Sequence, residues 1–349
     1  MAKGEKAERK SAYAQAGVNI DVKMNAVGSI KQMVAATKTQ NVIGGIGAFG
    51  GLHKVPAGSD QILVASTDGV GTKLKVAAMM NRHDTVGQDI VNHCVNDILV
   101  QGAKPLFFMD YVGTAKVDPT IFKSVVSGLC KACKENKMAL LGGETAEMPG
   151  LYPAGEYDLV GTIVGSVSKK KLITGQSIRA GDVIIGFPSG GLQTNGFSLA
   201  RRVIFDLCQY SWQDKLPGTN QTFGDALLAV HKSFLKPVMA LMAKIKINGM
   251  AHITGGGFPD NIPRVLPKTV NAEIDRASWE VPTIFKFIQN QGKVDRDEMY
   301  RVFNMGIGFV VIIAKRDLAR AQGILRANHQ PYSVIGVCRK GGGIVTYVN

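Results

Sequence analysis

The sequence predicts a two-domain protein of the α/β or α+β class, and three observations support this prediction. The chain has 349 residues, more than the roughly 250–300 residues at which a single hydrophobic core stops growing. Hydrophobic residues make up 45% of the chain and charged residues 19%, as in folded globular proteins. Apolar strand patterns alternate with helical patterns along both halves, so each domain should combine a sheet with helices.

The chain is expected to begin with a mobile basic tail over residues 1–12, and a short helix is expected at residues 27–37. A glycine-rich segment, NVIGGIGAFGG, then spans Asn41–Gly51. Backbone N–H groups in such a segment can approach an anion because no side chain obstructs them. We therefore interpret it as a flap that closes over a phosphate group. A purely structural loop is the alternative interpretation.

Local signals place the elements of the first domain, residues 13–168. Asp118 is suited to cap a helix and Pro119 to occupy its first turn. Apolar residues then recur every four positions from Ile121 to Cys133, as on the buried face of a helix. The expected strands span residues 61–66, 105–112, 138–141 and 157–167, and the expected helices span residues 84–102 and 118–133.

The second domain, residues 169–349, is expected to begin at the lysine cluster Lys169–Lys171 and the turn region at residues 174–181. Glycine-rich turns at residues 190–191 and 252–257 interrupt its apolar segments. The expected strands span residues 183–187, 309–314 and 332–337, and the expected helices span residues 196–207, 224–246 and 317–327.

Charge and cysteine usage narrow the function classes. A formal net charge of +14, from 41 Lys and Arg against 27 Asp and Glu, favours an anionic ligand. The basic residues do not cluster with stacking aromatics, so nucleic-acid binding is not expected. The odd cysteine count and the lack of a secretory segment predict a cytoplasmic protein, and no apolar run reaches the length of a membrane span. Cys130 and Cys133 form a C-x-x-C, but no second pair accompanies them, so core packing explains them better than a metal or redox site.

Two nucleotide-binding motifs can be weighed against the sequence. Gly45–Gly50 matches G-x-G-x-x-G, and Asp68 lies 18 residues beyond it. A dinucleotide fingerprint needs a strand before the glycines and a helix after them. Here a helical pattern precedes the glycines and no helical face follows them, which argues against that fold. No G-x-x-x-x-G-K-[ST] is present, so a P-loop is excluded.

The heptapeptide TDGVGTK, Thr67–Lys73, follows an apolar strand and combines a carboxylate, glycines, a hydroxyl and an ammonium group. Mg²⁺ prefers oxygen ligands, and phosphate prefers lysine and free N–H groups, so this composition suits a metal–nucleotide site. A capped tight turn with a surface lysine is the alternative. Asp97 on a predicted helix, and Glu144 and Glu147 in GGETAEMPG, offer further carboxylates.

Two segments of the second half have the composition of phosphate sites. The segment Pro188–Ser198 joins a strand to a helix, and so does His252–Phe258. Glycines and hydroxyls at the start of a helix can bind phosphate through backbone N–H groups, although both segments can equally be structural turns. His252 is a possible general acid or base, or a hydrogen-bonded structural histidine.

Taken together, these motifs resemble the phosphoribosylformylglycinamidine cyclo-ligase family, also called aminoimidazole ribonucleotide synthetase, from about Tyr13 to the C-terminus. DGVGTK alone would also fit selenophosphate synthetase, hydrogenase-maturation proteins, thiamine-monophosphate kinase and formylglycinamide ribonucleotide amidotransferase. GGETAEMPG and TGGGFPDNIPRVLP single out the cyclo-ligase. The segments that carry the resemblance are TDGVGTKLK at Thr67, VNDILVQGAKPLFFMDY at Val95, GGETAEMPGLY at Gly142, SGGLQTNGFSLAR at Ser189, HITGGGFPDNIPRVLP at His252 and MYRVFNMGIGF at Met299.

The resemblance implies an ATP-dependent ring closure in purine synthesis. Formylglycinamidine ribonucleotide and ATP would become 5-aminoimidazole ribonucleotide, ADP and phosphate, by way of an iminophosphate. Catalysis would rest on positioning and charge stabilisation. Asp68 and Asp97 would hold Mg²⁺ on the ATP phosphates, and Lys73 would neutralise phosphate charge. Glu144 would be a further metal or substrate ligand.

The remaining site residues are also implied by the resemblance. Either Asn195, Gly196 and Ser198 or Gly255–Gly257 would bind the ribose 5′-phosphate. On the nucleotide side the expected residues are Gly44, Gly45, Gly47, Gly50, Gly51, Thr67, Asp68, Gly69, Gly71, Thr72, Lys73 and Asn96. On the substrate side they are Glu144, Thr145, Glu147, Ser189, Asn195, Gly196, Ser198, Gly255, Gly256 and Gly257.

The family fold implies a homodimer in which the N-terminal sheets of two subunits form a β-barrel, with active sites near the interface and a C-terminal α+β domain beyond. Two features depart from the family. The basic extension before Ser11 leaves open the possibility of a further, anionic partner. His53-Lys54 adds a phosphate contact of unassigned role. Another ATP-using member of the same structural family and a basic nucleic-acid-binding protein are the competing interpretations.

Overall fold

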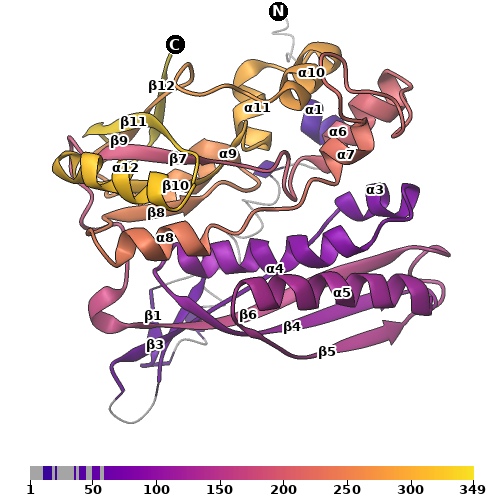
Figure 1. Cartoon of the computed structure of the whole chain (residues 1–349), viewed down its shortest axis with the longest axis horizontal. Coiled ribbons are helices and arrows are strands. Elements are labelled where there is room, and N and C mark those ends of the chain that lie inside the picture. The colour runs from indigo at the N-terminus through magenta and orange to yellow at the C-terminus, as the bar shows by residue number, and fades with distance from the viewer. Residues whose placement is uncertain (1–10, 18–19, 22–34, 37–38, 45–48, 56–58) are drawn as a thin grey trace, which may run out of the picture.

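A computed structural model describes residues 11–17, 20–21, 35–36, 39–44, 49–55 and 59–349. These residues form two six-stranded sheets with helices packed between and around them (Figure 1). The mixed α/β architecture in two parts agrees with the class that the sequence predicts. Most of the tail, most of the helix expected at residues 27–37, and Gly45 and Gly47 of the glycine-rich segment lie outside the described residues.

The first sheet has the strand order β1-β2-β3-β6-β4-β5. β6 pairs antiparallel with both β3 and β4, whereas β4 and β5 run parallel. The helices α4 and α5 lie together on one face of it (Figure 1). Its strands are β1 (Val42–Ile43), β2 (Gly51–Lys54), β3 (Gln61–Gly69), β4 (Lys104–Thr114), β5 (Ala139–Glu147) and β6 (Tyr157–Ser168).

Helix α5 (Pro119–Glu135) forms where its local signals predict it. The Asp118 side chain accepts hydrogen bonds from the backbone N–H groups of Thr120 and Ile121, and Pro119 occupies the first turn. Cys133 is buried in the core and Cys130 is exposed. Core packing is therefore confirmed for Cys133 and is wrong for Cys130, and burial raises the pKa of the Cys133 thiol to about 12.

Helix α4 (Asp84–Leu99) is buried along almost its whole length. α5 lies against it so closely that a Cβ on Gly87 or Gly128 would come about 2 Å from backbone atoms of the other helix. Its remaining sides contact the first sheet and, at Asn92 and Asn96, the second half of the chain. Polar side chains of α4 are therefore forced into the interior, where they must find partners.

The second sheet has the strand order β12-β9-β11-β7-β10-β8, with β12 parallel to β9 and the other pairs antiparallel. β10 is buried at every position. The strands are β7 (Val183–Pro188), β8 (Gly249–His252), β9 (Val270–Asp275), β10 (Ile307–Ile313), β11 (Ser333–Lys340) and β12 (Val345–Val348). The helices include α3 (Lys73–Met79) before α4, and α6 (Phe197–Arg201), α7 (Phe223–Leu227), α8 (Leu235–Met242), α9 (Gly257–Asn261), α10 (Thr283–Gly292), α11 (Arg296–Val302) and α12 (Leu318–Ala327) in the second half.

The single helix expected at residues 224–246 is wrong, because two short helices, α7 and α8, occupy that range. Side chains of α4 bind the backbone between them: Asp89 accepts from the N–H of His231, and Asn92 donates to the carbonyl of the same residue. These backbone groups are thereby withdrawn from helical hydrogen bonds. Segment 229–234 consequently runs as an extended connection across α4.

The sheet face opposite α4 and α5 carries no helix in the described part of the chain (Figure 1). Leu106 and Met109 of β4 are 46% and 43% exposed, and Leu141 of β5 is 63% exposed. Among the residues that the structure describes, β1 and β5 stand at the two edges without a further strand, so this sheet is open rather than a closed barrel. None of the helices in the described residues combines the length and the hydrophobicity of a membrane span.

Candidate functional site

The candidate site is centred on the polar face of α4. His93, Asn96 and Asp97 stand three and four residues apart, so they share one face of the helix. That face is directed toward the second half of the chain, and all three residues are at most 6% exposed. Their polar atoms therefore depend on partners supplied by other elements.

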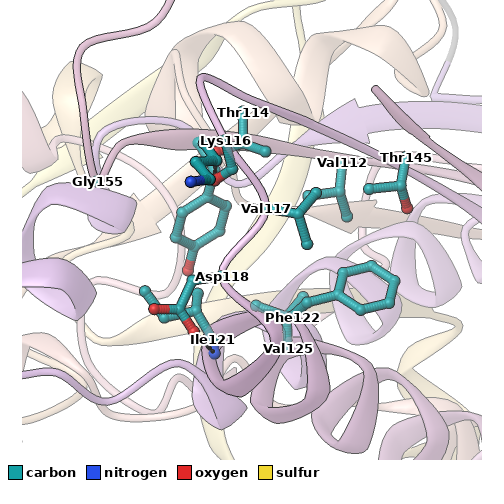
Figure 2. A pocket seen from close by; sticks show the side chains of 11 residues that line it. Val112, Thr114, Lys116, Val117, Asp118, Ile121, Phe122, Val125, Thr145 and Gly155 are labelled. Atoms are coloured by element: carbon teal, nitrogen blue, oxygen red, sulfur yellow. Dashed lines mark hydrogen bonds between the residues drawn. The ribbon is translucent and has the colours of Figure 1, made fainter. Parts of the chain in front are cut away.

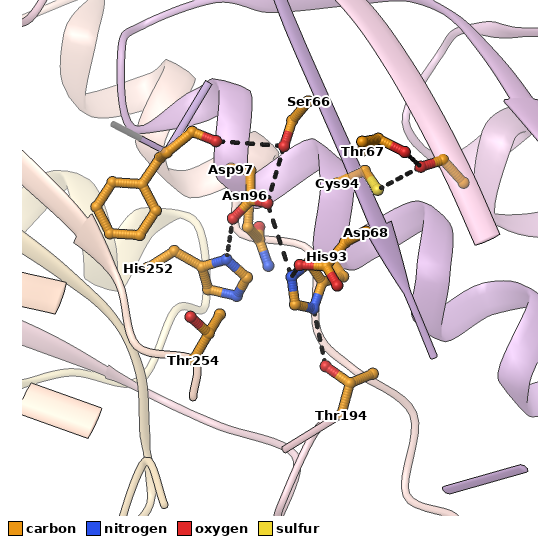
Figure 3. A network of polar contacts seen from close by, with 12 residues as sticks. Ser66, Thr67, Asp68, His93, Cys94, Asn96, Asp97, Thr194, His252 and Thr254 are labelled. Atoms are coloured by element: carbon orange, nitrogen blue, oxygen red, sulfur yellow. Dashed lines mark hydrogen bonds and ion pairs between the residues drawn. The ribbon is translucent and has the colours of Figure 1, made fainter. Parts of the chain in front are cut away.

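Asp97 joins both halves of the chain (Figure 3). Its Oδ1 accepts a hydrogen bond from His252 Nδ1 at the end of β8, at 2.8 Å. Its Oδ2 accepts from the hydroxyl of Ser66 in β3, at 3.2 Å. His93 Nε2 lies 3.7 Å from Asp97 Oδ2 and 2.8 Å from Asp68 Oδ2, so this imidazole bridges the two carboxylates.

Three imidazoles meet at this point. His231 Nε2 lies 3.0 Å from His252 Nε2, and the ring of His93 has its centroid 5.2 Å from that of His231 and 5.0 Å from that of His252. The Thr194 hydroxyl lies 2.8 Å from His93 Nδ1 and 3.3 Å from His231 Nδ1. We call His93, His231 and His252 the histidine cluster.

The three histidines differ in charge. Burial by itself lowers the pKa of His93, but the negative charges of Asp68 and Asp97 outweigh burial and raise the pKa to about 9. Burial lowers the pKa of His252, against the opposing effect of Asp97, and lowers that of His231 well below its usual value. At neutral pH the site therefore holds one cationic imidazole between two carboxylates and two neutral imidazoles behind them.

The glycine-rich segment ends against this group. The Ser66 hydroxyl that contacts Asp97 also lies 3.2 Å from the carbonyl of Phe49, and Gln101 donates to the carbonyl of Gly50. Gly50 is buried, while Gly51 begins β2 and Gly44 is exposed with a positive φ of 78°. At the end of the expected flap, Phe49 is therefore linked to Asp97 through Ser66, and Gly50 is held by Gln101.

An exposed cation accompanies the segment. The Arg264 guanidinium lies over the Phe49 ring, 4.8 Å from its centroid. Although the residue as a whole is exposed, packing of the guanidinium against the protein removes part of its water and lowers the pKa of Arg264, while the charges of Asp97, Asp260 and Asp68 act in the opposite direction. Arg264 is therefore a positive group in the neighbourhood of the two site carboxylates, available to an anionic ligand.

The turn after β3 brings the two halves together at a second point. Asp68 Oδ1 accepts from the N–H of Gly69, and Gly71 follows with a positive φ of 72°. Thr72 Oγ1 then lies 3.2 Å from Ser198 Oγ, at the start of α6. The DGVGTK turn and the SGGLQTNGFS segment, far apart in sequence, thus share one hydroxyl pair.

Three residues expected to bind nucleotide make contacts within the protein. The Lys73 side chain is fully buried, 2.7 Å from the Asp89 carboxylate, and donates to the carbonyl of Ala229. The Thr67 hydroxyl donates to the carbonyl of Gly161 on the neighbouring strand.

Asn96 donates to the carbonyl of Lys232 and accepts from the N–H of Phe234. Because α4 is enclosed on all sides, these groups are used to hold segment 229–234. In this structure the three groups therefore make contacts within the protein, and their expected contact with ATP stays a prediction.

The glycine-rich segments of the second half lie next to each other. A Cβ on Gly255 would lie 3.0 Å from Asn195 Oδ1. Gly196 has a positive φ of 78° and faces the Phe303 ring, which a Cβ there would approach to 2.1 Å. Gly256 and Gly257 also have positive φ, whereas the Ser189 hydroxyl is engaged within its own loop, 2.8 Å from the carbonyl of Gly191.

Glu144, Thr145 and Glu147 are not brought to the carboxylate pair within one chain. They lie on β5, which is separated from β3 by β6 and β4. Successive cross-strand partners are Gly69, Val160, Tyr111 and Glu144, so β3 and β5 are three strand spacings, or about 14 Å, apart. Glu144 accepts from the N–H of Thr145, and Glu147 accepts from that of Val117. These three expected residues therefore belong to a different edge of the sheet.

Two cavities lie apart from the carboxylate pair. One, between α5 and strands β4 and β5, has a volume of about 40 Å³ and is lined mainly by apolar side chains such as Val112, Phe122 and Val125 (Figure 2). The other has a volume of about 890 Å³ and is lined by residues including Lys104, Lys232 and His231. Neither includes Asp68 or Asp97, so the candidate site is defined by its polar groups rather than by these cavities.

Several functional candidates were not found from the sequence. His93 stands four residues before Asp97, and this spacing on a predicted helix was a usable signal for it. His231, Thr194 and Arg264 carry no comparable signal, because their partners lie on other elements. The grouping of His252 with Asp97 identifies this histidine, which the sequence left open, as part of the site.

Chemically, the arrangement offers carboxylate oxygens, imidazole nitrogens, hydroxyls and glycine backbone at the junction of the two halves. The hydroxyls and N–H groups suit phosphate oxygens, and the carboxylates and imidazoles suit cations or protons. No group among the described site residues forms a Ser-His-Asp or Cys-His arrangement, since Ser198 contacts Thr72 and Cys94 donates to the carbonyl of Gly161. Charge stabilisation therefore fits the site better than nucleophilic catalysis.

Comparison with known proteins identifies the family. The model for AIR synthase related protein, N-terminal domain, matches residues 50–167, and that for AIR synthase related protein, C-terminal domain, matches residues 179–349. The phosphoribosylformylglycinamidine cyclo-ligases of Alkaliphilus metalliredigens (strain QYMF) and Thermoanaerobacter sp. (strain X514) are 47% and 49% identical to the chain over 334 residues, which cover 95% of this chain and 96% and 99% of theirs.

Solved structures show the same fold at low sequence identity. Thiamine-monophosphate kinase from Stenotrophomonas maltophilia K279a has a TM-score of 0.63 at 16% identity, over 91% of this chain and 95% of its own. The hydrogenase maturation protein HypE in complex with ATP has a TM-score of 0.61 at 15% identity, over 95% and 92%. From the two family models and the near full-length relatives, the chain belongs to the phosphoribosylformylglycinamidine cyclo-ligase family.

Proposed function

We propose that the junction between Asp68, Asp97 and Ser198 is the active site of an ATP-dependent cyclo-ligase. The chain is a ligase of purine biosynthesis that uses ATP to convert formylglycinamidine ribonucleotide into 5-aminoimidazole ribonucleotide, with release of ADP and phosphate. One observation carries the assignment of the site: Thr72 of the DGVGTK turn lies 3.2 Å from Ser198 of the second half. A nucleotide held by the first segment and a substrate phosphate held by the second would thus be neighbours.

We assign ATP to the first half of this junction. Gly71 follows Asp68 in the turn, where Asp68 Oδ1 accepts from the N–H of Gly69, and the segment that ends at Gly50 is tied to Ser66. Arg264, over the Phe49 ring, adds a cation in place of the buried Lys73. The positive charge needed by a triphosphate therefore comes from Arg264.

The ribose 5′-phosphate is assigned to the glycine-rich segments of the second half. Asn195 and Gly255 lie against each other, so Asn195–Ser198 and Gly255–Gly257 form one surface rather than two alternative sites. Gly196 cannot carry a side chain because the Phe303 ring occupies that space. The close backbone leaves N–H groups and the Ser198 hydroxyl for the phosphate.

The reaction requires that the formyl oxygen become a leaving group. Transfer of the γ-phosphoryl group to this oxygen gives ADP and an iminophosphate. The amidine nitrogen then attacks the same carbon, closes the imidazole and expels the oxygen as phosphate. Asp97 and His252, joined at 2.8 Å and shielded from water, are placed to hold a proton that moves during these steps.

Mg²⁺ is the ion expected to accompany ATP, and it would supply charge neutralisation on the phosphates. The Asp68 side chain is 46% exposed and presents a carboxylate at the mouth of the site, so its oxygens fit this ion. Asp97 lies deeper, at 8% exposure, with both oxygens hydrogen-bonded. Asp68 would therefore meet Mg²⁺ first, with Asp97 behind it.

We further propose a cytoplasmic homodimer in which the open face of the first sheet meets the same face of a second copy. The exposed apolar side chains of Leu106 and Met109 would be buried in such an interface. Pairing of two open sheets would complete the β-barrel that the family fold implies. The interface would approach β5, so that Glu144, Thr145 and Glu147 face an active site shared with the partner. The oligomeric state measured by sedimentation tests this proposal, and a monomer contradicts it.

The function is tested by following ADP and 5-aminoimidazole ribonucleotide in one reaction with Mg-ATP, with and without formylglycinamidine ribonucleotide. Equal formation of both products, only when the substrate is present, is expected. ADP release without imidazole formation would point to another member of the ATP-using structural family. No turnover by folded protein, together with salt-sensitive nucleic-acid binding, would point to a basic binding protein.

Two variants test the assignment of the site. Asp68→Asn should abolish turnover of Mg-ATP, whereas Asp60→Asn, before the other end of β3 and also exposed, should leave it unchanged. Ser198→Ala should mainly raise the KM for the ribonucleotide. An effect of Ser198→Ala confined to the KM for ATP would reverse the assignment of the two halves.

A further inference from the structure

We propose that His93, Asp97 and His252 form a binding site for a transition-metal ion of the Zn²⁺ or Co²⁺ class, in addition to the Mg²⁺ that accompanies ATP. One ligand atom from each residue lies within 4.8 Å of the others, and all three side chains are buried. This inference deepens the proposed function, on which it rests for the position of ATP and substrate. The metal-binding group itself is defined by geometry alone.

The spacing of the donor atoms suits such an ion. Two donors that bind zinc at about 2.0–2.1 Å in tetrahedral geometry lie about 3.3 Å apart. His252 Nδ1 lies 2.8 Å from Asp97 Oδ1, and His93 Nε2 lies 3.7 Å from Asp97 Oδ2. These two separations involve different oxygens of Asp97, and one ligand atom from each of the three residues lies within 4.8 Å of the others, so small shifts of the side chains would be needed to enclose an ion.

The outer contacts of both imidazoles support the same arrangement. A histidine that binds a metal through one ring nitrogen needs an acceptor for the N–H of the other. His93 Nδ1 faces the Thr194 hydroxyl at 2.8 Å, and His252 Nε2 faces His231 Nε2 at 3.0 Å. An ion bound here would replace the proton that Asp97 and His252 share in its absence. With Nε2 of His93 and Nδ1 of His252 turned to the ion, each far nitrogen can donate to its neighbour. His231 is thereby placed as a positioning residue for His252.

The donor set also selects among divalent ions. Mg²⁺ prefers an octahedral shell of oxygens and usually keeps several waters. Two imidazole nitrogens and one carboxylate in a buried pocket suit zinc or cobalt better. Magnesium at the exposed Asp68 and a transition ion at the inner group therefore occupy different positions.

The inner ion would keep a position open toward the substrate. Asp68 Oδ2, 2.8 Å from His93 Nε2, marks the side from which solvent reaches the group. An oxygen ligand, from the phosphoryl group or from the formyl group of the ribonucleotide, is the chemical class that this open position would accept. The site thus has three protein ligands, and its fourth position lies on the side where the Asp68 carboxylate contacts His93 in this structure.

Binding is tested with Co²⁺ as the probe, on full-length protein stripped with a chelator and returned to a buffer with excess Mg²⁺. We expect one Co²⁺ per chain, a visible absorption band from nitrogen-containing coordination, and loss of the band when Zn²⁺ is added. Absence of Co²⁺ binding by the folded wild-type protein in excess Mg²⁺ would overturn the proposal without the need for any variant.

Variants locate the ion. His93→Ala and His252→Ala should each weaken Co²⁺ binding by at least about 100-fold, and His231→Gln by about 10- to 100-fold. The matched control is His83→Gln, another buried histidine, which contacts Tyr157 at 2.9 Å outside the cluster. The control should bind Co²⁺ like the wild type. Equal binding by His93→Ala, His252→Ala and His83→Gln would place the ion elsewhere and refute the site.

The outcomes separate this inference from the proposed function. Imidazole formation by stripped protein with Mg-ATP, together with no Co²⁺ binding, refutes the metal site and leaves the cyclo-ligase reaction standing. Stoichiometric Co²⁺ binding that is lost in both ligand variants, together with no imidazole formation, supports the metal site and refutes the reaction. Both properties in one preparation support both proposals.

Discussion

Replacing His93 by glutamine should make the stability of the protein less dependent on pH between neutral and alkaline conditions. His93 is buried between Asp68 and Asp97, with its Nε2 2.8 Å and 3.7 Å from their carboxylate oxygens. Burial lowers its pKa, but the two negative charges prevail and raise it to about 9, from an ordinary value of 6.5. Glutamine retains a polar group of similar reach and removes the titration.

The size of the effect follows from this difference in pKa. One pKa unit corresponds to about 1.36 kcal/mol, so a rise from 6.5 to about 9 corresponds to about 3 kcal/mol of folding free energy. The folded protein has the higher pKa. Its extra stability is therefore fully present below pH 6.5 and is lost as the pH rises through about 9.

The measurement is the free energy of unfolding in urea, with a chelator present, at several pH values from about 6 to 10. The stability of the wild type relative to His93→Gln should fall by about 3 kcal/mol over this range. His83→Gln is the control, because burial lowers the pKa of His83 and no change in its charge is expected above neutral pH. A difference between wild type and His93→Gln that stays constant across the range would refute the charge state deduced for the site.

Three further predictions concern residues whose role the structure changed or explained. Lys73→Met should destabilise the fold by about 3–5 kcal/mol, because it leaves Asp89 buried without its partner. The double variant Lys73→Met with Asp89→Leu should recover much of the stability. Turnover by the folded double variant would show that the lysine is structural. Gly196→Ala should lower the melting temperature, because the new Cβ would lie 2.1 Å from the Phe303 ring and φ is positive at this position. An unchanged melting temperature would contradict the close approach of Gly196 to Phe303. Asn96→Ala should cost about 2–4 kcal/mol in urea unfolding through two lost buried hydrogen bonds, whereas a loss confined to ATP affinity would support a nucleotide role.

Much of the local structure could be predicted from the sequence. Asp118 and Pro119 identify the start of α5 because capping and first-turn preferences depend only on neighbouring residues. The break in the expected helix at residues 224–246 could not be predicted in this way. It arises because Asp89, Asn92 and Asn96 of α4 bind the backbone of segment 229–234, and such long-range partners leave no trace in local periodicity.

In the candidate site, too, some residues could be identified from the sequence and the surroundings of others could not. Asp68, Asp97 and the DGVGTK turn were identified by composition and by their place at strand ends or on a helix face. The same reasoning assigned Lys73 to phosphate, because a lysine after a glycine turn is usually exposed. The side chain instead pairs with Asp89 inside the protein, since α3 and α4 are covered by the second half of the chain.

By itself the sequence determined the family, the mixed α/β class and the motifs that carry carboxylates, glycines and hydroxyls. These features are encoded in short segments whose residue types and order suffice to recognise them. Only the tertiary structure decided that His93, His231 and His252 meet around Asp97 and that Thr72 meets Ser198. Those contacts join residues more than a hundred positions apart in several cases, and the packing of α4 between the two halves, rather than any local preference, brings them together.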